Sequence, residues 1–226
     1  MIIKRFINIL KARHNQKIVI HSLFKTGTTS VGHGLIKLGI GHREMGWNPG
    51  VIHGLEGLIK PANELANKSD TYAHFYKEYG KQIKQTFKLL KQRCENYDTF
   101  SDHPIGHTTI HPYIKRALFG KPILIWINRD QTEWLKSAKD WELTHPQIYP
   151  DAEQKWLHDE KAQINRLITM RTAEKAIFDL YKQEFPTESL ELDLKDESLW
   201  QNIANHFGKN ITNFTPPHLN KAKDPN

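Results

Sequence analysis

The chain has 226 residues, of which 38% are hydrophobic and 25% are charged. This length and balance fit one folded α/β domain and argue against a disordered chain. Lys and Arg number 32 against 25 Asp and Glu, so the formal net charge of +7 at pH 7 favours anionic partners: phosphate, sulfate, nucleic acid or acidic glycans. The single cysteine, Cys94, excludes an internal disulfide, so we expect a cytoplasmic protein in which Cys94 is a packing residue.

Residues 1–16 are expected to form an N-terminal helix that packs on the domain. Residues 1–10 are apolar and basic. This stretch is shorter than the ~20 apolar residues that cross a bilayer, and no small-residue cleavage site follows its apolar part. We therefore expect no membrane span, with weak contact between this helix and a membrane surface as the alternative.

A strand, a turn and a helix follow in that order. Residues 17–23 are rich in β-branched and apolar side chains, which predicts a short buried strand. After a turn of Gly and Thr, residues 30–38 predict a helix with Val31 and Leu35 on one face. Gly39 ends this helix.

Residues 40–97 are expected to form a largely helical and irregular insertion. Residues 40–61 contain many Gly, His and Pro residues, which predicts a loop with one short helix that could line a substrate pocket. Residues 76–94 predict a helix with apolar side chains on one side and lysines on the other. We interpret the lysines as a solvated face.

The second half of the chain alternates between strand and helix patterns. Residues 122–128 are apolar almost throughout, as in a parallel strand covered on both faces. Strands are also expected at 98–101 and 189–194, and helices at 110–119, 132–141 and 197–207. Residues 151–184 predict a long helical region, either straight or bent. The alternation predicts a single domain, residues 1–226, with a three-layer α/β/α architecture around a central parallel sheet.

The turn between the first predicted strand and helix has the composition of an anion-binding loop. Its sequence is Lys25-Thr26-Gly27-Thr28-Thr29-Ser30. A helix N-terminus there exposes unpaired backbone N–H groups and the positive end of the helix dipole, which together bind phosphate or sulfate. Gly27 permits close approach of the backbone, Thr28 and Thr29 add hydroxyl donors, and Lys25 adds a positive charge.

This loop differs from that of the nucleoside triphosphatases, in which the lysine follows the second glycine of GxxxxGK[ST]. Here Lys25 precedes the loop's only glycine, Gly27. The order Lys-x-Gly-Thr-Thr resembles the phosphosulfate-binding loop of sulfotransferases. The resemblance implies a P-loop-like sulfotransferase fold. It also implies 3′-phosphoadenosine 5′-phosphosulfate (PAPS) as donor, 3′,5′-bisphosphoadenosine (PAP) as product, and no metal.

A second pair of residues extends the resemblance. Sulfotransferases carry an Arg at the end of a central strand and a Ser eight positions on, and both hold the 3′-phosphate of the nucleotide. Arg129 ends the strongest predicted strand, and Ser137 stands at that spacing in the next helix. An Arg at this edge can donate two parallel hydrogen bonds to a phosphate, where ligands of open α/β sheets bind.

Two further segments resemble the family. One branch carries an Asp before a nearby Pro, and here Asp102 stands before Pro104. Another branch uses a His, and His103 loosely resembles that residue. The resemblance implies that Asp102, or else His103, is the general base. The C-terminal run Pro216-Pro217-His218-Leu219-Asn220-Lys221 resembles the tail of the Asp-bearing branch. This resemblance implies that Lys221 approaches the nucleotide phosphate.

Two other patterns are interpreted as non-functional. His103, His107 and His111 are spaced four apart, as on a metal-binding helix, but prolines and a glycine interrupt any helix there, so we expect no metal site. The basic composition lacks any nucleic-acid-binding signature, so we expect no nucleic-acid partner.

Together these motifs predict a sulfotransferase that moves a sulfuryl group from PAPS to an acceptor hydroxyl of a carbohydrate or small molecule. One alternative is a kinase of the same layered fold that uses ATP and magnesium. Another is a non-catalytic module that binds phosphorylated nucleotides. The sequence leaves the acceptor, the choice of general base and the oligomeric state open.

Overall fold

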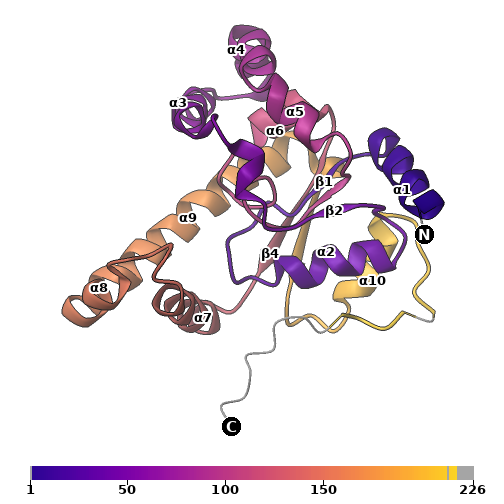
Figure 1. The fold of residues 1–226 in the computed structure, drawn as a ribbon. Helices are drawn as coiled ribbons and strands as arrows, with labels where there is room; N and C mark the ends of the chain where they lie inside the picture. The colour runs from indigo at the N-terminus through magenta and orange to yellow at the C-terminus, as the bar shows by residue number, and fades with distance from the viewer. Residues whose placement is uncertain (1, 213, 218–226) are drawn as a thin grey trace.

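A five-stranded sheet forms the centre of the computed structural model, which describes residues 2–212 and 214–217 (Figure 1). The strand order is β2-β3-β1-β4-β5, and every neighbouring pair is parallel. The strands are β1 (Ile18–Val19), β2 (Glu44–Met45), β3 (Thr99–Phe100), β4 (Ile123–Asn128) and β5 (Ser189–Asp193). The expected α/β class with a parallel sheet is confirmed.

The longest strand, β4, is buried along nearly its whole length because it lies between β1 and β5. Its register sets Ile18 beside Ile123 and Leu124 beside Ser189. Alternate side chains of β4 point to opposite faces of the sheet, and both faces are covered. This explains why residues 122–128 carry an unbroken apolar pattern rather than an alternating one.

One face of the sheet is covered by α2 (Thr28–Lys37) and α10 (Leu199–His206), which lie together in Figure 1. Val31 and Leu35 of α2 and Ile203 of α10 pack in one cluster with Ile18 and Ile125 of the strands. These apolar contacts hold α2 against β1, so the turn that joins them lies at the carboxyl edge of the sheet.

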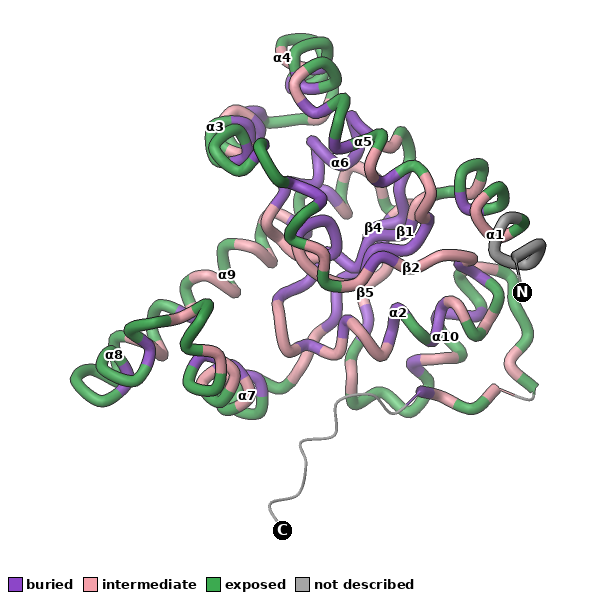
Figure 2. The backbone as a smooth tube through the Cα atoms, in the orientation of Figure 1, coloured by how far each residue is buried: buried purple, intermediate pink, exposed green. Residues whose placement is uncertain are grey.

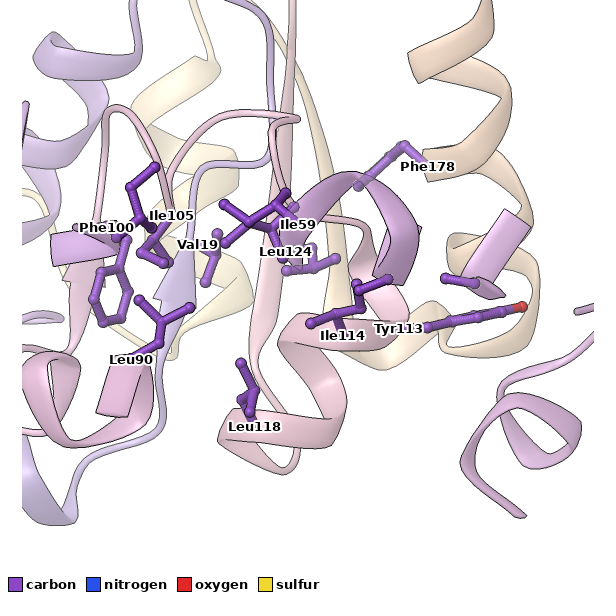
Figure 3. Close-up of a cluster of buried hydrophobic side chains, with 14 of the residues drawn as sticks. Val19, Ile59, Leu90, Phe100, Ile105, Tyr113, Ile114, Leu118, Leu124 and Phe178 are labelled. Carbon is purple, nitrogen blue, oxygen red and sulfur yellow. The ribbon is translucent and has the colours of Figure 1, made fainter. Parts of the chain in front are cut away.

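The opposite face carries the larger apolar cluster. The helices that contribute to it include α3 (Glu56–Asn67), α4 (Tyr72–Thr86), α5 (Lys88–Cys94), α6 (Pro112–Phe119) and α9 (Glu160–Glu184). Figure 3 shows Val19 and Leu124 of the strands beside Ile114 of α6, with Phe178 of α9 at the far side. Figure 2 shows the buried strands between helices that are exposed on their outer sides, so the three-layer arrangement is confirmed.

The segment 40–97 is largely helical, as expected, but it also contributes β2, which the sequence analysis did not identify. β2 is two residues long and pairs with β3 at the edge of the sheet. A strand this short carries no periodic signal, so tertiary pairing decides its formation. The remaining elements of this segment are the 3-10 helix η1 (Pro49–Ile52) and helices α3, α4 and α5.

Two predicted helices are each divided in the structure. The helix expected at 76–94 is α4 and α5, separated at Phe87, and Thr71 caps α4 by accepting a hydrogen bond from the backbone N–H of His74. The helix expected at 151–184 is α8 (Ala152–His158) and α9, separated at Asp159. Asp159 accepts from the backbone N–H of Ala162, and such an N-cap starts a new helix rather than continuing the old one.

The other predicted helices form close to their expected bounds. α1 (Ile2–His14) is the N-terminal helix, and its Ala12 is fully buried. α7 (Gln131–Thr144) follows β4, and Asp130 caps it by accepting from the backbone N–H of Glu133. Among the described residues, no helix combines the length and apolar character needed to cross a bilayer.

Candidate functional site

A cavity of about 550 Å³ opens at the carboxyl edge of the sheet. The connection after β1 runs toward β2, whereas the connection after β4 runs toward β5, so the strand order reverses between β1 and β4. Open α/β sheets bind ligands at such a reversal. The lining residues are Leu23, Phe24, Lys25, Gly27, Thr28, Thr29, Trp47, Asn63, Asp102, His103, His107, Thr108, Thr109, Trp141, Ile148, Tyr149, Met170 and Glu174.

The predicted anion-binding loop, which follows β1, is held in shape by hydroxyl groups of Ser22 and Thr26. The Thr26 hydroxyl is buried, donates to the Leu23 carbonyl at 2.7 Å, and lies 3.0 Å from the Ser22 hydroxyl. The Ser22 hydroxyl also accepts from the backbone N–H of Ile127 in β4, at 3.3 Å. Thr26 therefore fixes the shape of the loop, while Thr28 and Thr29 line the cavity.

The loop backbone takes conformations that favour glycine. Gly27 has φ 88°, and Lys25 has φ 62°, a region that side-chain-bearing residues rarely adopt. A Cβ at Gly27 would lie 3.0 Å from Leu194 Cδ1, just beyond β5. Gly27 also precedes α2 without a side chain to cap it. The first turn of α2 therefore presents its N–H groups at the cavity, where a helix terminus favours an anion.

Lys25 lies half-buried against Trp141 of α7, with its Nζ 4.7 Å from the centre of the indole ring. Burial lowers the pKa of Lys25, the nearby Arg129 lowers it further, and Asp102 and Asp140 act in the opposite direction. Trp141 is thus a site residue that the motif spacing did not identify. A cation over an indole face gains electrostatic attraction from the ring quadrupole, which holds the ammonium at this edge.

Arg129 follows β4 and reaches back to the loop. Its Nη1 donates to the Lys25 carbonyl at 2.7 Å. Its Nε is buried and has no hydrogen-bond partner among the described residues, since Glu133 Oε2 lies 3.9 Å away. Trp134 of α7 donates from its indole N–H to the Phe24 carbonyl at 3.0 Å. The side chains of Arg129 and Trp134, which both follow β4 in the chain, therefore hold two consecutive carbonyls of the loop, those of Lys25 and Phe24.

A second arginine, Arg171 of α9, lies against Arg129, and the sequence patterns did not identify it. Its Nη2 donates to the Arg129 carbonyl at 2.6 Å, and its guanidinium lies 5.2 Å from the centre of the Trp134 ring. Its Nη1 is buried without a hydrogen-bond partner in the part of the chain that the structure describes. An unpartnered buried guanidinium N–H is costly, and an anionic ligand would satisfy it.

The remaining nucleotide residues predicted from the sequence have different positions. Ser137 is half-buried on α7, one helical turn after Trp134. Arg129, Ser137 and Ser30, which lies in the first turn of α2, are not among the residues that line the cavity. Lys221 falls outside the described residues.

Asp102 follows β3 and lines the same cavity as Lys25. Its Oδ1 accepts from the backbone N–H of His103 at 2.7 Å, and His107 Nε2 lies 3.1 Å from the same oxygen without the alignment of a hydrogen bond. Burial raises the pKa of Asp102, although the His103 N–H and the charge of Lys25 oppose this. A carboxylate with a raised pKa in a cavity has the character of a general base.

His103 lies beside Asp102 with its ring between Trp47 and Thr109. The ring centres of His103 and Trp47 are 5.2 Å apart, and His103 Nδ1 is 3.1 Å from the Thr109 hydroxyl. Burial lowers the pKa of His103, so its ring is neutral at pH 7, and a neutral imidazole can also accept a proton. Both candidate bases predicted from the sequence are thus brought to one cavity.

A buried polar cluster supports the loop that carries Asp102. Lys115 of α6 is fully buried, donates to the His107 carbonyl at 2.6 Å, and has its Nζ 2.7 Å from His21 Nδ1. Burial holds the pKa of Lys115 well below its usual value and lowers the pKa of His107 to about 3. Glu174 of α9 closes this side of the cavity, and burial raises its pKa.

The histidines at 103, 107 and 111 do not form a helical stripe. They lie in the irregular segment between β3 and α6, where His111 caps α6 by accepting from the backbone N–H of Tyr113. Among the described residues, no group of three or more His, Cys, Asp or Glu side chains is arranged to hold a metal ion.

The structure shows an α/β protein with a cavity at the carboxyl edge of a parallel sheet. No protein-family model matches the sequence, and no curated protein matches it. Functional inference for this chain therefore depends on the geometry described above.

Proposed function

We propose that this protein is a sulfotransferase that uses PAPS as donor and a hydroxyl compound as acceptor. The observation that carries the proposal is the 2.7 Å hydrogen bond from Arg129 Nη1 to the Lys25 carbonyl. It brings the two anion-binding segments predicted from the sequence next to each other at one edge of the sheet. A nucleotide with a phosphate group at each end would span two such adjacent sites.

The residues present fit a nucleotide of this kind. The α2 N-terminus, uncapped by Gly27, offers N–H donors, and Lys25 adds a positive charge beside it. Arg129 Nε and Arg171 Nη1 are buried donors without partners among the described residues. One end of the site therefore offers N–H groups and an ammonium, and the other offers two guanidinium groups.

In this proposal, Lys25, Thr28 and Thr29 hold the 5′-phosphosulfate, and Arg129 and Ser137 hold the 3′-phosphate. We add Arg171 to the second group because of its unpartnered Nη1. When bound, PAPS supplies the sulfuryl group for transfer. Fixed donors at the leaving oxygen lower the barrier because they need no reorganisation during the reaction.

Asp102 is the proposed general base, and His103 is its alternative. The Asp102 carboxylate lines the cavity beside the loop and can accept the proton of an acceptor hydroxyl placed there. Its raised pKa makes it a stronger proton acceptor than an exposed aspartate. The cavity walls beyond it carry the aromatic rings of Trp47 and Tyr149, which suit a carbohydrate or a small organic alcohol.

The decisive experiment compares PAP, ADP and ATP with magnesium in a thermal-shift assay, followed by transfer of labelled sulfate from PAPS to a panel of alcohols. A ligand that binds only the folded state raises the melting temperature. We expect PAP to give the largest shift. A larger shift with ATP and magnesium would favour a kinase, and PAP binding without any sulfate transfer would favour a non-catalytic nucleotide-binding module.

A further inference from the structure

A basic surface lies at the amino edge of the sheet, opposite the site. It comprises Lys77, Lys81, Lys84, Lys88 and Lys91 of α4 and α5, with Arg13 and His14 of α1 and Lys121 before β4. These elements meet at a cavity of about 660 Å³ that Arg13, His14, Lys84, Lys91 and Lys121 line together. We call this set of residues the basic face.

The five lysines of α4 and α5 lie on one side of these helices. In α4, Lys77, Lys81 and Lys84 are four and three residues apart, and in α5 Lys88 and Lys91 are three apart, so each group lies on one side of its own helix. The buried side of the same helices carries Phe75, Ile83 and Leu90. All five lysines are exposed, so they point away from the core on both helices.

Few carboxylates neutralise this surface. Glu78 lies 3.9 Å from Lys77, and Glu95 pairs with Arg13 at 2.8 Å. Within the described part of the chain, Lys81, Lys88, Lys91 and Lys121 form no ion pair, and Lys84 contacts only the hydroxyl and ring of Tyr76. The basic face thus presents uncompensated positive charge that only an anionic partner would balance.

Apolar side chains protrude from α1, the helix that also carries Arg13 and His14 of the basic face. Ile7 and Leu10 of α1 are 43% and 41% exposed, whereas Ala12 is fully buried. Leu10 and Lys11 come three and four residues after Ile7, and all three are exposed, so they share the outer side of α1. Figure 1 shows α1, α4 and α5 at the top and right of the molecule, away from α7, and Figure 2 shows their outer sides exposed.

We propose that the basic face docks the protein on an anionic membrane surface, with Ile7 and Leu10 of α1 entering the headgroup region. Lysines attract an anionic leaflet, and each adds roughly fivefold to the affinity. Exposed apolar side chains on a basic helix add interfacial binding. A nucleic acid would use the lysines but would gain nothing from Ile7 and Leu10, so the combination favours a membrane.

This docking leaves the candidate site open to solution. Arg13, Asn15 and Lys121 lie before the strands, whereas Lys25, Asp102 and Arg129 lie after them. Parallel strands place these two groups at opposite edges of the sheet. The inference is therefore independent of the proposed sulfotransferase activity.

The test is sedimentation of the full chain with vesicles of phosphatidylcholine containing 30 mol% phosphatidylserine, against vesicles of phosphatidylcholine alone. We expect binding only to the anionic vesicles and its loss at high salt. The variant K84E/K88E/K91E should lose at least tenfold in affinity, and I7S/L10S should bind more weakly while keeping the salt dependence. The matched control is K136E/K155E/K209E, which changes the net charge equally at exposed lysines elsewhere.

Circular dichroism shows whether each variant is folded, and K84Q/K88Q/K91Q replaces the charge-reversal variant if that one is not. Equal loss in the control variant would mean that only net charge matters, and would overturn the proposal. So would failure of the wild-type chain to sediment with anionic vesicles, or tighter binding to a single-stranded RNA that I7S/L10S leaves unchanged.

Discussion

The guanidinium of Arg129 donates a 2.7 Å hydrogen bond to the backbone carbonyl of Lys25 and so joins the carboxyl end of β4 to the loop after β1. These residues are 104 positions apart in the chain. The parallel pairing of β1 with β4 brings their loops together. The contact defines the centre of the proposed nucleotide site, and several tests depend on it.

Arg129→Ala is expected to weaken binding of PAP by roughly 10- to 100-fold, because a charge-assisted hydrogen bond contributes about 1.5–3 kcal/mol. Isothermal titration calorimetry measures this loss directly. The control ligand is AMP, which lacks the 3′-phosphate and should bind the wild type and the variant equally. Equal losses for PAP and AMP would show that Arg129 acts by supporting the loop rather than by contacting the 3′-phosphate.

Arg171→Ala tests the arginine that only the structure identified. Its Nη1 lacks a partner among the described residues, and its Nη2 donates to the Arg129 carbonyl. We expect a smaller but selective loss of PAP affinity, about tenfold, with AMP binding retained. Unchanged PAP affinity in a folded variant would remove Arg171 from the site.

Lys25→Ala is expected to reduce sulfate transfer by roughly 100- to 1000-fold, because the reaction loses a fixed positive group at the leaving oxygen. The variant should fold, since Lys25 is half-exposed and its Nζ contacts the Trp141 ring. Initial rates with labelled PAPS measure the effect, and Lys136→Ala, an exposed lysine on α7, is the control. Retained activity in K25A would remove Lys25 from the mechanism.

The pH dependence of transfer separates the two candidate bases. A base must be deprotonated, so kcat/KM should rise with pH through the pKa of the group responsible and then level off. Burial raises the pKa of Asp102 above its usual value and lowers that of His103. The rising limb should disappear together with activity in Asp102→Asn, whereas His103→Gln should keep it. The opposite pattern would make His103 the base.

Gly27→Ala is expected to lower the free energy of unfolding by about 1–2 kcal/mol, the typical cost of a side chain in a left-handed conformation. Urea denaturation measures the change. Gly54→Ala is the matched control, since Gly54 has φ 80° but a Cβ there would meet nothing within 4 Å. The difference between the two variants isolates the 3.0 Å contact with Leu194 Cδ1. Equal losses would mean that this contact relaxes freely.

Local sequence patterns were sufficient to predict most of the elements. The strand β4 and the Gly-Thr turn before α2 were predicted correctly, because each pattern depends only on residues that are adjacent in the sequence. For residues 151–184 a bend was left open, but the position of the break between α8 and α9 was not predicted, because Asp159 acts as a cap within a continuous helical pattern. The edge strand β2 was missed because its two residues form a strand only through pairing with β3.

The sequence alone determined the class of fold, the position of the turn before α2 and the placement of Asp102 and Arg129 after strands, since the residues that end a strand or begin a helix are neighbours in the sequence. Only the tertiary structure decided that Trp141 and Glu174 line the cavity beside Lys25 and that Arg171 lies against Arg129. Trp141, Glu174 and Arg171 lie on helices whose patterns reflect packing, and their position at the site follows from how α7 and α9 pack against the sheet. Contacts across such long separations depend on the whole fold and leave no signal in adjacent residues.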